Sequence, residues 1–258
     1  MAKTYRSAGL TPQARNVIVF GATSAIAQAV CRLLSRQRCR FFLIARDAAK
    51  LAAVEADLKV RGAEVEGSQA VDLCDTSLHP DLIAEAWHRL GTVDACIIAH
   101  GLLGDQAQAE RDWAEAAAIL NVNFISVASL VTHLANRFEK QGSGRIVAIG
   151  SVAGDRGRKT NYVYGAAKGA LETFLEGVRH RLASRGVAVL LVKPGFVDTP
   201  MIAHLPKSPL FASPDPVARS IVSAMDKGKS TIYTPIFWRP VMLMIRLLPE
   251  WLFNRLSI

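Results

Sequence analysis

Short apolar runs alternate with helical stretches along the chain, and this alternation limits the choice of fold more than any other feature. The runs have the length of strands and lie at residues 16–20, 40–44, 64–71, 93–98, 145–149, 187–192 and 231–234. Most of them are continuously apolar, which is typical of strands buried on both faces. Strands that alternate with helices predict an α/β fold, a doubly wound parallel sheet of about seven strands with helices on both faces.

One domain is expected to cover residues 1–258, because the chain is long enough for one large core and shows no linker or internal repeat. Hydrophobic residues make up 50% and charged residues 21%, a globular composition. The stretch 195–214 is rich in proline and cannot form a long helix, so we expect a mobile substrate flap there. Residues 237–258 are an unusually apolar C-terminal extension.

The chain is basic, with a formal net charge of +9 and a pI near 9.7. Its lysine and arginine residues are dispersed and are not interleaved with aromatic residues, which argues against nucleic acid as a partner. Anionic small ligands or an anionic membrane surface suit this charge better.

The compartment is expected to be reducing and cytoplasmic. Residues 1–15 lack the apolar core of a signal peptide. The cysteines form no C-x-x-C pair and the histidines show no metal-ligand spacing, so we expect neither a disulfide framework nor a metal site. These residues are Cys31, Cys39, Cys74 and Cys96, with His79, His88, His133 and His180.

Tyr164 and Lys168 stand four positions apart, and Ser151 precedes them just after the run 145–149. Positions i and i+4 share a helix face, so the Lys168 ammonium should lie beneath the Tyr164 phenol and lower its pKa towards neutrality. Ser151 would donate to a substrate oxygen. Together the three side chains predict an acid-base site for carbonyl reduction. The alternative is that Tyr-x-x-x-Lys is a coincidence of a helix surface.

A tight turn, Gly-Ala-Thr-Ser-Ala-Ile-Ala from residue 21, joins the first run to a helix. Such a turn directs free backbone N–H groups and the positive end of the helix at an anion, as the pyrophosphate of a dinucleotide requires in a Rossmann-type fold. Ala25 departs from the usual glycine spacing, because its methyl group would face the phosphate and alanine resists positive φ. A plain strand-helix turn is the alternative. The candidate phosphate-binding residues are Gly21, Thr23, Ser24, Ala25 and Ile26.

The second run ends in Ala45-Arg46, without an acidic residue at the strand tip. A neutral residue followed by arginine favours the 2′-phosphate of NADPH, and NADH remains open. The alternative to phosphate binding is that Arg46 only caps a surface turn. Asp72 and Leu73, after the third run, are expected to border the adenine.

These motifs in this order resemble the short-chain dehydrogenase/reductases over essentially the whole chain. The resemblance implies a homo-oligomer and a fourth catalytic residue, Asn123, which holds a water and links Lys168 to solvent. It also implies that Pro194, Gly195, Val197 and Thr199 hold the nicotinamide. Tyr164 and Lys168 are expected to contact the cofactor as well, with Lys168 at the nicotinamide ribose. The family's Asn-Asn-Ala-Gly reads Ile98-Ala99-His100-Gly101 here, which puts an imidazole near the cofactor.

Several tracts outside these motifs resemble one branch of the family. They begin at Ala99, Asn161, Met201 and Val241. That branch reduces the 2-keto group of a polyprenyl-phosphoryl pentose in forming arabinose, after a flavin-dependent oxidase has produced the ketone. The resemblance therefore implies a lipid-linked sugar, a role in building the cell envelope and an oxidase partner.

Two further features suit a phosphorylated, lipidic ketone. Arg156, Arg158 and Lys159 lie between Ser151 and Tyr164, and guanidinium groups match phosphate oxygens, although a solvated basic loop is equally open. The extension 237–258 is interrupted too often to cross a bilayer but suits its interface. Packing of this extension on its own domain or on a second subunit is the alternative. His204 in the flap is a further candidate substrate residue.

The sequence thus predicts an NAD(P)H-dependent reductase of a ketone. One alternative is a reductase of another hydrophobic ketone, such as a steroid or a fatty-acyl chain. An alternative of another class is an NADP(H)-binding scaffold or sensor without turnover, suggested by the alanines of the phosphate turn.

Overall fold

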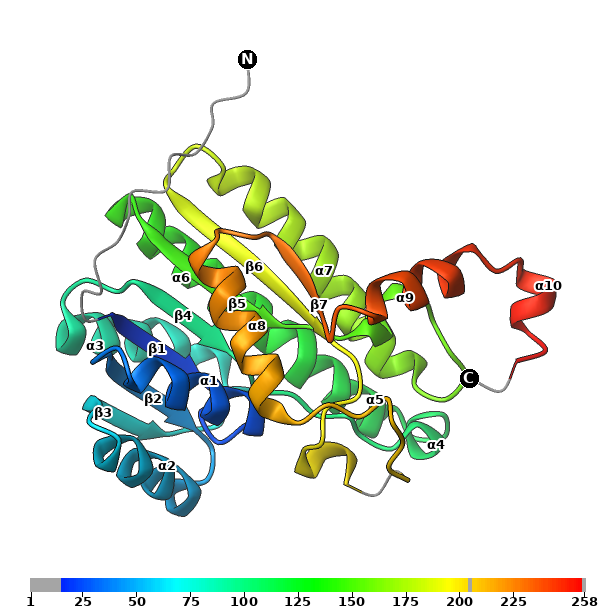
Figure 1. The fold of residues 1–258 in the computed structure, drawn as a ribbon, viewed down its shortest axis with the longest axis horizontal. Helices are drawn as coiled ribbons and strands as arrows, with labels where there is room; N and C mark the ends of the chain where they lie inside the picture. The colour runs from blue at the N-terminus through cyan, green and yellow to red at the C-terminus, as the bar shows by residue number, and fades with distance from the viewer. Residues whose placement is uncertain (1–14, 204–205, 257–258) are drawn as a thin grey trace.

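The computed structural model describes residues 15–203 and 206–256, and the chain folds around one parallel sheet (Figure 1). The order across the sheet is β3-β2-β1-β4-β5-β6-β7, and every neighbouring pair is parallel. The strands are β1 (Asn16–Phe20), β2 (Arg40–Ala45), β3 (Glu64–Ala70), β4 (Ala95–Ile98), β5 (Gly144–Ile149), β6 (Val187–Pro194) and β7 (Thr231–Thr234). The doubly wound parallel sheet predicted from the sequence is therefore confirmed.

Helices cover both faces of the sheet (Figure 1). The larger ones are α1 (Ala25–Ser35), α2 (Ala48–Val60), α3 (His79–Leu90), α5 (Trp113–Leu120), α6 (Ser126–Gln141), α7 (Tyr162–Leu182), α8 (Pro214–Asp226) and α9 (Trp238–Leu247). The shorter ones are α4 (Gln106–Ala109), α10 (Glu250–Phe253), the 3₁₀ turns η1 (Thr76–Leu78), η3 (Val152–Asp155) and η4 (Pro200–Ile202), and the π-helical turn η2 (Asn121–Ile125).

Two apolar cores lie on opposite faces of the sheet. One joins alternate strand residues such as Val17 and Val19 to helices α1, α2 and α8. The other joins Ile18 and Phe20 to α3, α6 and α7. Successive side chains of a strand point to opposite faces, so central strands must be apolar at every position. The continuous apolarity of the sequence is explained by this arrangement.

The helical run 113–141, made of α5, η2 and α6, is long and apolar enough by composition to cross a membrane. Its α6 side chains, including Leu130, Val131 and Phe138, are fully buried in the second core. The apolarity of the α6 part of this run is therefore explained by its burial in the core.

The order in which successive strands join the sheet reverses between β1 and β4. Strands β2 and β3 are added on one side of β1, and β4 to β7 are added on the other. The crevice beyond the carboxyl ends of the strands at such a switch point is where ligands bind in open α/β sheets. The turn at Gly21, the segment at His100 and the turn at Ser151 all follow strand ends at this edge.

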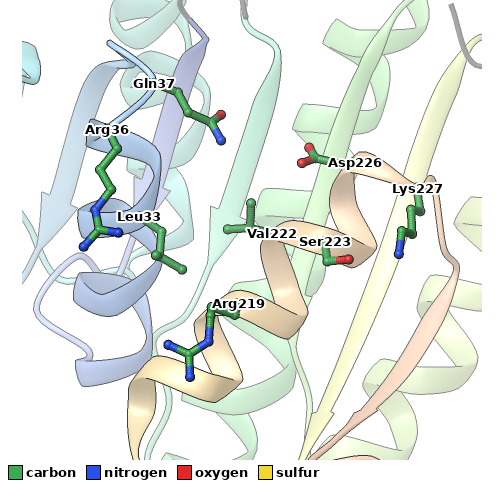
Figure 2. A pocket seen from close by; sticks show the side chains of 8 residues that line it. All are labelled: Leu33, Arg36, Gln37, Arg219, Val222, Ser223, Asp226 and Lys227. Atoms are coloured by element: carbon green, nitrogen blue, oxygen red, sulfur yellow. The ribbon is translucent and has the colours of Figure 1, made fainter. Parts of the chain in front are cut away.

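A surface hollow lies on the face of the sheet that carries α1 and α8, between the end of α1 and the second half of α8 (Figure 2). Leu33, Arg36 and Gln37 line it from one side, and Arg219 and Asp226 are among the residues opposite. None of the predicted site residues that the structure describes borders this hollow.

The flap stretch 195–214 contains no long helix among its described residues. Its two ends run side by side in the same direction where Val197 and Ala212 form a parallel bridge, and an exposed ion pair joins Lys207 to Asp198. His204 lies outside the described residues.

Candidate active site

Ser151 caps the turn η3 directly after β5. Its Oγ accepts a hydrogen bond from the Ala153 N–H at 3.1 Å. The turn lies very close to α7, since a side chain at Gly154 would come within 2.8 Å of the Gly169 nitrogen. Likewise, a side chain at Gly165 would meet the Ala153 carbonyl oxygen at 2.9 Å. Glycines at these positions therefore allow the serine turn to pack directly on the helix that carries Tyr164 and Lys168.

Tyr164 and Lys168 lie on one face of the first turns of α7. The Ser151 hydroxyl is hydrogen-bonded to the Tyr164 phenol. Lys168 is 4% exposed, and its Nζ lies 5.6 Å from the centroid of the Tyr164 ring. The same Nζ donates to the Ile149 carbonyl at 3.0 Å. The structure thus brings the three predicted catalytic side chains together at the end of β5.

The electrostatics of this trio differ from the sequence expectation. Burial raises the pKa of Tyr164 to about 12, and the bond from Ser151 only partly opposes this rise. Burial also lowers the pKa of Lys168 to about 8. Dehydration penalises the charged form of each group, and it is the largest cause of both shifts. The expectation that Lys168 brings the phenol pKa towards neutrality is therefore wrong for the chain alone, and Tyr164 keeps its proton at neutral pH.

Asn123 is fully buried in the π-helical turn η2. Its Nδ2 donates to the Leu102 carbonyl at 2.6 Å and to the Ile119 carbonyl at 2.8 Å. Its Oδ1 accepts from the Leu102 N–H at 3.2 Å. Asn121, the neighbour that could be confused with it, is exposed. The wider backbone turn directs the Asn123 amide inward, to the side of the Gly101 segment that Lys168 also approaches.

His100 belongs to a hydrogen-bonded group that sequence reasoning did not identify. The Ser126 hydroxyl donates to the Leu73 carbonyl at 2.6 Å, so the His100 Nε2–H donates to Ser126 Oγ at 3.0 Å. His79 adds a second bond to the Leu73 carbonyl at 3.0 Å. Burial lowers the pKa of His100 to about 3, so the imidazole is neutral. Its Nδ1 is buried without a partner and is therefore an acceptor available beside the crevice.

The phosphate turn begins at Gly21, whose φ of +77° places it in the left-handed region. The Cβ of a side chain there would come within 2.4 Å of the backbone nitrogen of His100. The Ser24 side chain makes no capping bond to α1, so the N–H groups of the first helical turn keep their capacity for an anion. Ala25 begins α1 with helical geometry, and Arg38 is the one non-glycine of positive φ among residues 15–203 and 206–256. The concern that Ala25 must adopt positive φ is therefore removed. Thr23 and Ile26 lie in the same turn.

Arg46 is exposed at the end of β2, directly after the buried Ala45. Asp47, the next residue, caps α2 by accepting from the Lys50 N–H at 3.0 Å. Asp72 is exposed at the end of β3 and accepts from the Cys74 N–H at 2.9 Å. Leu73 beside it is buried. This edge of the crevice therefore presents one guanidinium and one carboxylate.

The segment predicted to hold the nicotinamide follows β6. The Ala212 backbone N–H donates to the Phe196 carbonyl at 2.9 Å, and the Asp198 backbone N–H donates to the Ala212 carbonyl at 2.8 Å. This pairing points the peptide groups of the intervening Val197 to the opposite side of the segment. Pro194 ends β6, and Gly195 is covered by Trp238, whose Nε1 would lie 1.9 Å from a side chain at that position. Thr199 precedes the turn η4.

Arg156 does not point to a phosphate site. Its Nη1 donates to the carbonyls of Ile245 at 2.5 Å and Leu248 at 2.7 Å, and its guanidinium covers the Phe253 ring with 3.8 Å between the Cζ and the centroid. The prediction that Arg156 grips a substrate phosphate therefore fails, because the last turn of α9 supplies the oxygens instead. Burial lowers the pKa of Arg158, whose Nε is buried without a partner, so Arg158 keeps an unused donor.

A buried cluster of charged side chains holds the turn that begins at Ser151, and the sequence analysis did not predict it. Lys193, 1% exposed at the end of β6, forms ion pairs with Asp155 and with Glu172 at 2.7 Å. The Tyr233 hydroxyl donates to Asp155 at 2.9 Å. The sequence does contain a sign of this cluster, which is the single lysine that follows the apolar run 187–192. A lysine at the end of a buried strand requires a carboxylate partner, because an unpaired buried charge is costly.

The sheet, the phosphate turn and the Ser-Tyr-Lys trio define an NAD(P)H-dependent oxidoreductase. The family model of the short chain dehydrogenases matches residues 15–209, and the chain belongs to this family of short-chain dehydrogenases and reductases.

An uncharacterized oxidoreductase of Mycobacterium tuberculosis is 36% identical to the chain over 240 residues, which cover 93% of this chain and 96% of the relative. The ketoacyl reductase HetN of Nostoc is 29% identical over 224 residues, 84% of this chain and 77% of the relative. A solved actinorhodin polyketide ketoreductase with NADPH superposes with a TM-score of 0.78 at 24% identity, covering 86% of this chain and 96% of that one. At that identity the likeness shows the shared fold.

Proposed function

We propose that the protein reduces a ketone, with Tyr164 as the proton donor. The observation that carries this proposal is the hydrogen bond between Ser151 and a phenol that burial keeps protonated. A carbonyl oxygen placed between the two hydroxyl groups receives a hydrogen bond from Ser151 and the proton of Tyr164. A phenol that holds its proton is suited to reduction, whereas oxidation of an alcohol needs the phenolate as base.

The residues at the switch point fit a nicotinamide dinucleotide. The close approach at Gly21 and the open first turn of α1 suit its pyrophosphate, and the peptide groups of Val197 suit the carboxamide. When bound, the cofactor supplies the hydride. The chain's own groups then orient the ketone through Ser151, protonate its oxygen through Tyr164, and replace that proton through Lys168 and the segment held by Asn123.

The cofactor is proposed to be NADPH, because Arg46 stands beyond the neutral Ala45 and Asp47 is engaged as a helix cap. Arg46→Gln is expected to raise the KM for NADPH at least about tenfold and to leave the KM for NADH nearly unchanged. A hydrogen bond to a charged group contributes about 1.5–3 kcal/mol. Steady-state kinetics with both cofactors measures this difference. Arg61→Gln, also on the surface near α2, is the control, and equal effects on both cofactors would argue against the assignment.

The reaction is expected to lose rate in alkali. Since burial lowers the pKa of Lys168 to about 8, kcat/KM for ketone reduction should fall above pH 8, by about tenfold per pH unit at the steepest. Tyr164, with a pKa of about 12, stays protonated in this range and does not cause the fall. A profile of kcat/KM from pH 6 to pH 10 measures the effect. A flat profile across this range would contradict the role of the Lys168 ammonium.

The proposed substrate is the 2-keto form of a polyprenyl-phosphoryl pentose. The support is the set of tracts that resemble decaprenylphosphoryl-2-keto-ribose reductase, together with the unused donor of Arg158. A flavin-dependent oxidase would supply the ketone, and the reaction would take place at the cytoplasmic face of the membrane. The test mixes the protein with NADPH or NADH and the lipid-linked keto-pentose and analyses the product. Formation of the arabinose epimer supports the proposal, and unreacted ketone beside active turnover of other ketones refutes it.

A second candidate is another hydrophobic ketone. Arg156 donates to carbonyl groups of the chain itself, so it is not free to bind a substrate phosphate. The aromatic rings of Phe196 and Phe211 stack beside the nicotinamide segment, with their centroids 5.3 Å apart, and offer an apolar surface to a hydrophobic substrate. The ketoacyl substrate named for HetN belongs to this class. Comparison of kcat/KM for a long-chain 3-ketoacyl thioester and the keto-pentose lipid distinguishes the two candidates.

A further inference from the structure

The outer face of α9 and α10 is apolar although it faces solvent. Leu243 is 57% exposed, Met244 63%, Leu247 73% and Trp251 64%. In Figure 1 the two helices, coloured red, extend away from the sheet. A cluster of large apolar side chains of this kind marks a surface that binds a partner.

The inner face of the same segment is fixed to the body of the protein. Trp238 and Met242 are buried against Val152, one turn of helix apart. Arg156 binds the carbonyls of Ile245 and Leu248 at the end of α9. The outward side chains are therefore held in place rather than left on a loose tail.

Positive charge borders this apolar face. Arg239 and Arg246 are exposed seven positions apart and lie on one flank of α9, and Arg255 follows α10. Glu250 is the single acidic residue between positions 236 and 256. An apolar helix face with arginine along its flank matches the acyl boundary and the phosphate groups of an anionic bilayer.

We propose that α9 and α10 dock on an anionic membrane surface, with Leu243, Leu247 and Trp251 in the interface and Arg239 and Arg246 at the lipid phosphates. A second copy of the chain is the alternative partner. In a two-fold dimer the same patch would face itself, so the arginine residues of the two chains would lie close together and repel each other, on a protein whose net charge is already +9. An anionic bilayer can bury the apolar side chains and pair its phosphate groups with the arginine side chains.

This docking would bring the site close to lipid. Trp238, on the inner face of α9, covers Gly195 and contacts Phe196 with ring centroids 5.5 Å apart. Those two residues begin the segment that we assign to the nicotinamide. The membrane would therefore lie one helix away from the proposed hydride-transfer site, where a lipid-linked ketone can reach it.

The test is cosedimentation of the full chain with vesicles of phosphatidylcholine, with and without phosphatidylglycerol. We expect the wild type to bind the anionic vesicles much more tightly than the neutral ones. The double variant Leu243→Ser with Leu247→Ser should bind the anionic vesicles at least about tenfold more weakly, and Arg239→Gln with Arg246→Gln should lose the preference for anionic over neutral vesicles. The control is Val60→Ser with Trp113→Ser, two other side chains that are 90% and 73% exposed. Circular dichroism verifies folding of each variant.

Absence of binding to anionic vesicles by the wild type, or equal weakening in the control, overturns the proposal. So does a concentration-dependent dimer in light scattering that the leucine variant loses, because a second copy would then cover the face. Vesicle binding needs no turnover, so its outcome is separate from that of the proposed reaction. Reduction of a small water-soluble ketone by the leucine variant at the wild-type rate shows that the site itself is intact.

Discussion

The Tyr164→Phe variant is expected to bind NADPH as the wild type does and to lose about 10²–10⁴-fold in kcat. The reason is that the Ser151 hydroxyl still orients the ketone, but no proton stands ready for its oxygen. Packing should change little, because the phenylalanine ring occupies the same space. Fluorescence titration with NADPH measures binding, and steady-state oxidation of NADPH with a ketone measures turnover.

Tyr162→Phe provides the matched control for this experiment. Tyr162 stands on the same helix two positions earlier and is 44% exposed. Its loss should leave kcat within about twofold, as is usual for an exposed side chain that does not contact the reacting groups. A Tyr164→Phe enzyme with near-native turnover, or one that has lost its affinity for NADPH, would rule out Tyr164 as the proton donor.

Lys193→Met is expected to lower the free energy of unfolding by about 3–5 kcal/mol, because it leaves the buried Asp155 carboxylate without its cation. Glu172, whose side chain is 25% exposed, can turn to water, but Asp155 cannot. Since Asp155 ends the turn that begins at Ser151, the surviving folded enzyme should also show a reduced kcat. Urea denaturation and steady-state kinetics measure the two effects.

Two further variants separate a charge effect from a general loss of packing. Adding Asp155→Asn to Lys193→Met removes the stranded carboxylate and should restore part of the lost free energy of unfolding. Lys207→Met breaks the exposed pair with Asp198 and should cost about 0–1 kcal/mol. If Lys193→Met destabilises no more than Lys207→Met, the cluster does not hold the serine turn.

The sheet was predictable because its apolar runs record burial on both faces. The runs 16–20 and 231–234 match β1 and β7 residue for residue. Strand ends were less certain. β6 continues through Lys193 and Pro194 because their backbone pairs with β7, although the side chain of Lys193 is charged. The length of a strand is set by backbone pairing, which apolarity reflects only indirectly.

The site was predictable where function depends on spacing along one helix, as for Tyr164 and Lys168. It was not predictable where distant segments meet. The engagement of Arg156 by the end of α9, some 90 positions further along the chain, could not be read from its basic neighbours. The pKa directions of Tyr164 and Lys168 were also missed, because dehydration depends on how completely the fold covers a group, and sequence spacing carries no measure of that cover.

The bond from Arg156 to the last turn of α9 also has a genetic consequence. A stop codon shortly before Ile245 would delete the carbonyls that receive this guanidinium and would uncover the turn that presents Ser151. Termination at that point would then impair the enzyme although every proposed catalytic residue is still present.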